Sequence, residues 1–249
     1  MLTSRRYMNC WVTTRRRRMQ RNRLLKFLLV VLALIAFLHF IVLPAASGGY
    51  NDECFIPDEK RRILRTMVQN ISKVFDKYDV QYWLDYGTLL GAYRMGDVLP
   101  HDHDADMSFL VTSNISQAFQ ELAKSGITAA GIKARFKGVI LDFVPWKPKY
   151  RTTHDGTQLM LYKSYPSYVL EKDNIMNRYH HKLETFPYSW AFPAGRINFH
   201  GVSASVPHSP EKLLSFRYPY TFGLFGVRMK TPYKWKCYVP CWLRKSNGC

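Results

Sequence analysis

The sequence predicts an α/β (α+β) fold: a small mixed sheet with flanking helices, preceded by one transmembrane helix. Between residues 57 and 145, stretches of helical periodicity alternate with short apolar stretches typical of strands, which indicates an α/β domain. The 249 residues are 47% hydrophobic and 15% aromatic, which is enough for the core of one large domain or two small ones. A single long apolar segment lies ahead of that domain.

The segment Leu24–Leu43 is almost wholly apolar, and Pro44 follows it. A helix of about 20 apolar residues spans a bilayer, so this segment is just long enough. Arginines cluster before it, around residues 15–18, and the positive-inside rule therefore places the N-terminus in the cytosol. We expect a cytosolic basic tail (1–23), a signal anchor (24–43), a short linker (44–56) and a lumenal domain (57–249).

Two other interpretations of the N-terminus remain open. Ala45–Ala46–Ser47 could be a signal-peptide cleavage site, and an arginine-rich start without acids is also typical of transit peptides. The basic region is long for a signal peptide, and the apolar segment is long for a transit peptide. We therefore favour a retained anchor. The net charge is +18, and half of it lies in the first 26 residues. Because arginines beside a membrane segment act as an orientation signal, we expect no nucleic-acid partner. The basic charge of the rest of the chain suits phosphorylated substrates or acidic glycans.

Four of the five cysteines lie on the predicted lumenal side. In an oxidising compartment they are disulfide candidates whose connectivity the sequence does not determine; they are Cys54, Cys237, Cys241 and Cys249. A zinc site at Cys237 and Cys241 is less favoured, because there is no CxxC spacing and no nearby histidine. The sequons at Asn70 and Asn114 predict N-glycosylation on the same side.

The remaining elements follow in chain order. Pro57, Asp58 and Glu59 begin a helix whose apolar residues recur at helical spacing as far as Tyr78. After it we expect a strand at 81–86, a short helix at 89–93, a strand through 104–110, a helix from Ser113 to near Gly126, a strand at Gly138–Pro145, a hairpin of 196–199 with 202–206, and a helix that begins at Ser209. Residues 146–190 show little periodicity, and we expect irregular, substrate-facing segments there.

The densest chemistry lies between Trp83 and Leu110. Asp104 and Asp106 alternate along a predicted strand, so both carboxylates point to one face, about 7 Å apart. Gly87–Thr88 opens a short helix whose first N–H groups would face an anion such as a phosphate. The segment therefore predicts an anion site beside a cation site.

Asp142 is the one acid of an otherwise apolar strand. A carboxylate in such a place costs several kcal/mol unless it is paired or metal-bound, so we expect it to join Asp104 and Asp106. The alternative is an acid at the sheet edge that caps a loop. Mg²⁺ or Mn²⁺ fits three carboxylates, because these hard cations prefer carboxylate oxygens and bridge donor phosphates.

Two motifs in this region resemble the LicD/fukutin family of nucleotidyltransferase-fold phosphotransferases, which includes fukutin and fukutin-related protein. They are Tyr82–Arg94, similar to the family's GTLLGxxR, and Leu99–Asp106, similar to its PWDDDID. A weaker similarity continues through Asp142 to about residue 222. The resemblance implies a mixed sheet of the nucleotidyltransferase type, in a single-pass type II protein of the Golgi or endoplasmic reticulum membrane.

The resemblance also implies a reaction. A phospho-alditol such as ribitol phosphate, or phosphocholine, would move from a CDP-linked donor onto a glycan of a glycoprotein or glycolipid. Carried over residue by residue, the implied site consists of Gly87, Thr88 and Arg94 for donor binding, and Asp104, Asp106 and Asp142 for catalysis and metal binding. For Arg94, a bond to a donor phosphate and a bond to local groups at the helix end are equally favoured.

Three positions depart from the family pattern, with His101, His103 and Ala105 in place of its Trp, Asp and Ile. His103 could add a nitrogen ligand and favour Zn²⁺, although such a histidine more often faces the other side of the strand. Asp102 is either a further metal ligand or a residue that orients the loop.

Two functions other than phosphotransfer stay open for this protein: a Golgi DxD glycosyltransferase that uses a sugar nucleotide, and a catalytically degenerate glycan-binding or scaffold subunit. The acceptor and the oligomeric state are not readable from the sequence.

Overall fold

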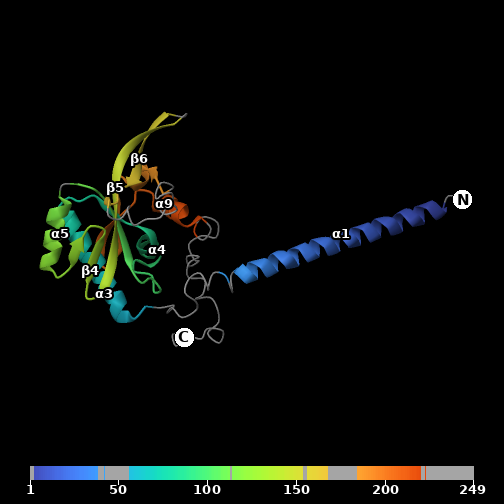
Figure 1. Cartoon of the computed structure of the whole chain (residues 1–249), viewed down its shortest axis with the longest axis horizontal. Helices are drawn as coiled ribbons and strands as arrows, with labels where there is room; N and C mark the ends of the chain where they lie inside the picture. Colours follow the sequence, from blue (N-terminus) through green and yellow to red (C-terminus); the bar gives the residue numbers. More distant parts are fainter. Residues whose placement is uncertain are drawn as a thin grey trace. The chain divides into compact units, whose positions relative to one another are not determined.

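The computed structural model describes residues 3–38, 42, 56–112, 114–153, 156–167, 184–219 and 222 (Figure 1). The chain divides into two compact units. Glu53–Trp235 forms one unit, and residues 1–52 together with 236–249 form the other. The sheet and the predicted acid cluster belong to Glu53–Trp235, which is described first.

The helix predicted after Pro57 is confirmed as α3 (Asp58–Lys77). Asp58 and Glu59 lie in its first turn, where the helix dipole favours carboxylates. The side chains that recur at helical spacing are buried in the core, among them Leu64, Met67, Ile71 and Phe75. The amphipathic pattern therefore does fix which face of this helix packs on the sheet.

The central sheet has seven strands and is mixed, as predicted. The strand order is β1-β2-β5-β4-β3, with β6 paired to β5 and β7 paired to β6. β2 and β5 are parallel, whereas β1 and β4 run antiparallel to their neighbours in this sheet. The strands are β1 (Tyr82–Leu84), β2 (Ala105–Leu110), β3 (Thr128–Ala130), β4 (Lys133–Phe136), β5 (Val139–Thr153), β6 (Gly156–Lys163) and β7 (Phe186–Pro187).

The expectation of irregular structure from residue 146 onward was wrong for its first part. β5 does not end at Pro145 but continues to Thr153, and it pairs with β6 over the whole of that extension. The two strands form an arm that extends beyond the rest of the sheet (Figure 1). The arm is a strand pair because each strand supplies the backbone partners of the other, a contact that the periodicity of a single segment does not reveal.

The two faces of the sheet carry different side chains. Phe109 and Phe143 point to one face, where they pack with Phe75 of α3 and with Phe119 of α5 (Ile115–Lys124). Because alternate residues of a strand point to opposite faces, the neighbouring even-numbered residues of β2 and β5 point to the other face. That second face lies under α4 (Tyr86–Met95) and α9 (Pro210–Arg217).

The remaining predicted elements are also present. β8 (Gly195–Phe199) and β9 (Val202–Val206) form the expected hairpin, and both turn residues, His200 and Gly201, have positive φ, as in a type I′ turn. α9 begins with Pro210 after Ser209, as predicted. A short helix, α8 (Tyr188–Ala191), precedes the hairpin. The predicted cap of α5, Ser113, lies outside the described residues, and Asn114 occupies the N-cap position.

In the other unit, α1 runs from Thr3 to Phe37. The predicted anchor Leu24–Leu43 thus begins within a helix, and its apolar side chains are exposed, Leu28 and Leu34 among them. None of the helices in the described ranges is both long enough and apolar enough for a membrane span. Beyond Phe37, the predicted anchor lies outside the described residues except at positions 38 and 42.

A buried ion cluster joins α3 to the loop that follows α4. Asp97 is 8% exposed and accepts hydrogen bonds from Arg61 at 2.8 Å, from Arg65 Nε at 2.6 Å and from the backbone N–H of Val98 at 2.7 Å. Burial by itself would raise the pKa of Asp97, but the two guanidinium groups and the Val98 N–H outweigh it, so the pKa is lowered. The cluster fixes the loop that leads from α4 to β2.

Replacing Asp97 by Asn is expected to lower the free energy of unfolding by about 2 kcal/mol at pH 7, because a charge-assisted network is lost. A carboxyl whose pKa is lowered by folding stabilises the fold above its unfolded pKa, about 3.9, and that contribution disappears as the pH falls through the folded pKa. The difference between wild type and Asp97→Asn should therefore shrink on acidification. Urea unfolding at pH 7 and pH 3 measures this, and a difference that grew toward pH 3 would contradict the assignment.

Candidate active site

The structure brings the predicted acids to one edge of the second face of the sheet. Asp106 is the second residue of β2, and its register partner on the parallel strand β5 is Asp142. Adjacent positions on neighbouring strands point to the same face, so the strand pairing confirms that these two acids lie side by side. Asp104 stands one residue before β2 begins, so it belongs to the loop and its expected alternation with Asp106 along one strand stays a prediction.

The electrostatics of the cluster are unfavourable without a cation. Burial raises the pKa of Asp106 well above its usual range, and the negative charges of Asp104, Asp102, Asp85 and Asp142 add to the effect. On the other side of Asp142, Lys133 forms an ion pair with a distance of 3.0 Å between Nζ and Oδ1. Because the neighbouring carboxylates destabilise the charged form of Asp106, the cluster is a place where a divalent cation would relieve repulsion.

The donor set fits Mg²⁺ or Mn²⁺ in its chemistry, because all the groups are carboxylate oxygens. In the described part of the chain, no group of three or more His, Cys, Asp or Glu side chains is placed to hold a metal ion. Asp142 instead directs Oδ1 to Lys133. This ion pair engages one of the two carboxylate oxygens of Asp142.

The first turn of α4 adjoins the acids. Asp85 is the N-cap and accepts a hydrogen bond from the backbone N–H of Tyr86 at 2.8 Å. A Cβ atom on Gly87 would lie 2.1 Å from Oδ2 of Asp102, so the Asp102 carboxylate packs directly on this turn. An anion at a helix N-terminus is favourable, and here a carboxylate of the chain already uses part of the site predicted for a phosphate.

Thr88 has a structural contact that was not predicted. Its hydroxyl accepts a hydrogen bond from the backbone N–H of Asp106 at 2.8 Å, and its side chain is buried. This bond links the first turn of α4 to the start of β2, and therefore sets the position of the anion site relative to Asp106. Donor binding by Gly87 and Thr88 stays a prediction.

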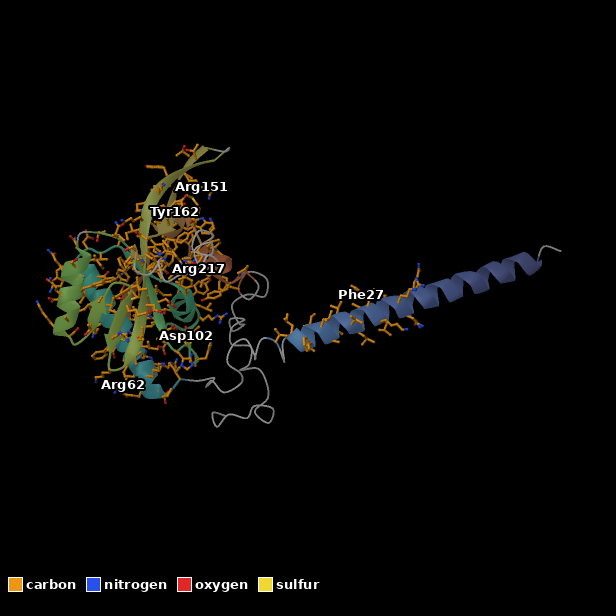
Figure 2. All side chains as sticks on the ribbon, in the orientation of Figure 1. Phe27, Arg62, Asp102, Arg151, Tyr162 and Arg217 are labelled. Atoms are coloured by element: carbon orange, nitrogen blue, oxygen red, sulfur yellow. The ribbon has the colours of Figure 1, made fainter. Side chains whose placement is uncertain are left out.

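Behind the acids lies a buried ion network that the sequence analysis missed. Asp85 is fully buried and accepts hydrogen bonds from Ser108 Oγ at 2.7 Å and from Arg217 Nη2 at 3.0 Å. Ser108 in turn accepts from Trp146 Nε1 at 2.9 Å. The N-cap of α4 is thus bonded to β2, β5 and α9 together (Figure 2 shows Arg217 on α9).

The same network continues toward β6. Glu184 accepts hydrogen bonds from Tyr86 Oη at 3.1 Å and from the ammonium group of Lys163, and Nη1 of Arg217 lies 3.3 Å from its carboxylate. The guanidinium carbon of Arg217 lies 4.2 Å from the centre of the Tyr86 ring, a cation–π distance. Beneath the site, the charges of Asp85 and Glu184 are therefore balanced by those of Arg217 and Lys163. Buried charges are tolerated only when they are paired in this way.

Two tyrosines border the acid cluster and were also missed. Burial raises the pKa of Tyr218, and the charges of Asp106 and Asp102 raise it further. Burial also raises the pKa of Tyr165, with Glu184 and Asp106 among its charged neighbours. No sequence signal singles them out, because they follow Asp106 by more than 50 positions and belong to no motif.

Arg94, His101 and His103 have different surroundings. Arg94 is in the last turn of α4, about 10 Å along the helix from Gly87, which suits the helix-end interpretation better than a phosphate contact. His101 is buried, at 3% exposure. His103 is exposed, and its Nδ1 lies 3.5 Å from Nζ of Lys60 on α3. The donor role of Arg94 and the metal role of His103 stay predictions.

The remaining predicted residues fall into two groups. Asn70 is half-buried in α3, and Asn114 donates its side-chain amide to the carbonyl of Tyr78 at 3.1 Å, so a glycan on Asn114 would disturb that bond. The disulfide candidates lie outside the described residues; they are Cys54, Cys237, Cys241 and Cys249.

The chain is similar to several known proteins. Ribitol 5-phosphate transferase FKRP from Mus musculus is 28% identical over 175 residues, which are 69% of this chain and 33% of that protein. An uncharacterized protein, RP689, from Rickettsia prowazekii is 25% identical over 169 residues, which are 66% of this chain and 57% of that protein. The chain thus spans about a third of the length of the FKRP protein it matches.

Among solved structures, the antibiotic-resistance factor ANT(2'')-Ia is similar with a TM-score of 0.41 and 13% identity, over 72% of this chain and 82% of that one. A nucleotidyltransferase-like protein from Paracoccidioides brasiliensis has a TM-score of 0.31 and 17% identity, over 61% of this chain and 62% of that one. The family model "LicD/FKTN/FKRP, nucleotidyltransferase domain" matches residues 79–209. That range includes both motifs, the paired acids of β2 and β5 and Glu184, and it covers more than half of the sequence. This chain belongs to the LicD/FKTN/FKRP family.

Proposed function

We propose that this chain transfers a substituted phosphate group, such as ribitol phosphate or phosphocholine, from a CDP-linked donor to a hydroxyl group of a glycan. The observation that carries the proposal is the pairing of Asp106 with Asp142 beside the first turn of α4. Similarity to two ribitol 5-phosphate transferases supports the donor class. The acceptor class is supported only by the family resemblance.

The roles of this chain's residues follow from their positions. Asp104, Asp106 and Asp142 would hold Mg²⁺ or Mn²⁺, with Asp142 released from Lys133. The bound cation would supply positive charge for the phosphate oxygens during in-line displacement. Backbone N–H groups in the first turn of α4 would contact the same phosphates, close to where Asp102 now packs.

Positioning is the second contribution of the protein. Phosphoryl transfer needs few covalent steps from the enzyme and depends on alignment of the attacking and leaving oxygens. The network of Asp85, Ser108 and Arg217 holds the N-terminus of α4 at a fixed place next to Asp106. Tyr165 and Tyr218, which border the acids, would help to exclude water from the reacting groups.

The proposal includes a lumenal site in the Golgi or endoplasmic reticulum, reached by an N-terminal anchor of type II orientation. Its support is the order of arginines before apolar residues, and the apolar side chains that α1 exposes along residues 24–38. A shift in mass after endoglycosidase treatment of the full-length protein would show that Asn70 or Asn114 reached the lumen. An unglycosylated protein imported into mitochondria would contradict the anchor.

Ligand-dependent melting tests the reaction class. Full-length protein is heated with CDP-ribitol, CDP-choline or a UDP-sugar, with Mn²⁺ or with EDTA. We expect a CDP-linked donor to raise the melting temperature with Mn²⁺ and not with EDTA, because a ligand that binds the folded state stabilises it by mass action. A shift with the UDP-sugar alone would identify a glycosyltransferase. No shift with any nucleotide would identify a degenerate subunit.

A further inference from the structure

A second concave site lies at the other end of β1. A pocket of about 490 Å³ is formed by the end of α3, the start of β1, the segment from Tyr188 to Arg196 and Ser205 of β9. Tyr82 lines this pocket, and Asp85, three residues further on, caps α4 beside the acid cluster. Three residues of extended chain span about 10 Å, and none of the clustered acids lines the pocket. The pocket is therefore separate from the proposed donor site.

One wall of the pocket is aromatic. The rings of Tyr188 and Phe192 are 4.9 Å apart between centroids, and Phe192 is supported from behind by Trp83 at 5.5 Å. Phe192 is nearly buried, so its position is fixed by the core, whereas Tyr188 is half-buried. A supported aromatic surface in an open pocket offers a flat apolar contact to a ligand.

The opposite wall is polar without a net charge. Arg196 donates from Nη1 and Nη2 to the two carboxylate oxygens of Asp76, at 2.8 and 2.6 Å. A further bond, from Arg196 Nη2 to the backbone carbonyl of Ser203 at 2.6 Å, holds the guanidinium in place. The side chains of Arg196 and Asp76 remain 43% and 39% exposed, so their outer edges still face the pocket. Gln81, which is exposed, adds an amide to this wall.

These two walls select a class of ligand. A nucleotide or another phosphate would need unbalanced positive charge, and here the one guanidinium is matched by one carboxylate. A purely apolar ligand would cover the Asp76–Arg196 pair without bonding to it, at a desolvation cost. A neutral sugar has hydroxyl groups that can bond to the Asp76–Arg196 pair. It also has a C–H face that can pack on the aromatic wall. The volume also lies within the usual range of small-molecule sites, about 300–1,000 Å³.

We propose that this pocket binds a neutral saccharide unit, as an anchoring subsite for the acceptor glycan. Its role toward the acceptor rests on the proposed function, whereas saccharide binding itself does not. Contacts to a part of the substrate remote from the reacting hydroxyl supply binding energy without entering the chemistry. Loss of the pocket should therefore raise KM for the acceptor more than it lowers kcat.

Saturation-transfer NMR on the full-length protein, in a detergent without a sugar headgroup, tests the binding. The probes are mannobiose, N-acetyllactosamine and chitobiose. We expect saturable binding of at least one probe that persists in excess CDP and in the Asp106→Asn variant. Tyr188→Ala should weaken it by about tenfold, equivalent to about 1.4 kcal/mol, and Gln81→Ala by a smaller factor. Tyr150→Ala is the matched control, because this tyrosine is 71% exposed on the β5–β6 arm and does not line the pocket.

The possible results separate the two proposals. The pocket proposal is overturned if no probe binds saturably, or if neither Tyr188→Ala nor Gln81→Ala changes the affinity. Gln81→Ala guards against misfolding, because it alters an exposed side chain. Saccharide binding that depends on Tyr188, in a protein that binds no CDP-linked donor, would reject the proposed function and keep the pocket. Turnover of a CDP-linked donor by a protein that binds no saccharide probe would keep the proposed function and reject the pocket proposal.

Discussion

Asp106→Asn is expected to reduce group transfer by about 10³-fold while the domain stays folded. The substitution removes the negative charge that would bind the cation, at the one acid whose pKa is raised by burial and by four neighbouring carboxylates. Since the charge is costly in the metal-free fold, its removal should leave the melting temperature equal to or above that of the wild type. Initial rates with a CDP-linked donor and melting without metal measure the two effects.

The matched control for this variant is Asp79→Asn. Asp79 is exposed, follows α3 and has a positive φ of 52°, a conformation that asparagine also tolerates. We expect normal transfer in this variant. Asp106→Asn with more than a tenth of wild-type activity would reject the assignment of Asp106, and loss of activity in both variants would point to a general effect of acid removal.

Arg217→Met is expected to lower the free energy of unfolding by about 3–5 kcal/mol, because it leaves buried acids without their counter-charge. Asp85 is fully buried and Arg217 is 2% exposed, with 3.0 Å between Nη2 and Oδ2. The side chain also covers the Tyr86 ring and contacts Glu184. Denaturant unfolding followed by tryptophan fluorescence measures the loss, since Trp83 and Trp146 lie in the core beside this network.

A double-mutant cycle separates loss of charge pairing from loss of packing. Adding Asp85→Asn keeps a residue able to cap α4 and removes the stranded charge. The double variant should therefore be more stable than Arg217→Met alone. Arg151→Met, on the exposed β5–β6 arm, serves as the control and should change stability by less than about 0.5 kcal/mol (Figure 2). Equal losses in Arg217→Met and Arg151→Met would show that the network contributes nothing.

Much of the fold was predictable because local patterns carry it. The periodicity of α3, the start of α9 at Pro210 and the turn at His200–Gly201 each depend on residues close in the sequence, and each appeared as expected. The outer half of β5 was missed for the converse reason. Its stability depends on β6, and a segment with mixed residues has no alternation of its own to reveal a strand pair.

The candidate site divides in the same way. The spacing of Asp104 and Asp106, the Gly87–Thr88 turn and the isolated acid Asp142 were readable, because each is a local feature of the sequence. That Asp142 joins Asp106 was expected from its isolation in an apolar strand, but the register that pairs the two was not readable, since it depends on which strand is the neighbour of β2. The order and register of the strands depend on pairing across the whole sheet.

By itself, the sequence indicated the residues of the candidate site: acids close to a helix N-terminus, in a chain with an arginine-rich start. Only the tertiary structure decided which groups support that site. Arg217 and Asp85 are 132 positions apart and meet because α9 folds back over the second face of the sheet. Charges can be buried there only as matched pairs, because the low polarity of the interior makes an isolated charge too costly, and such matching becomes visible only once the chain has folded.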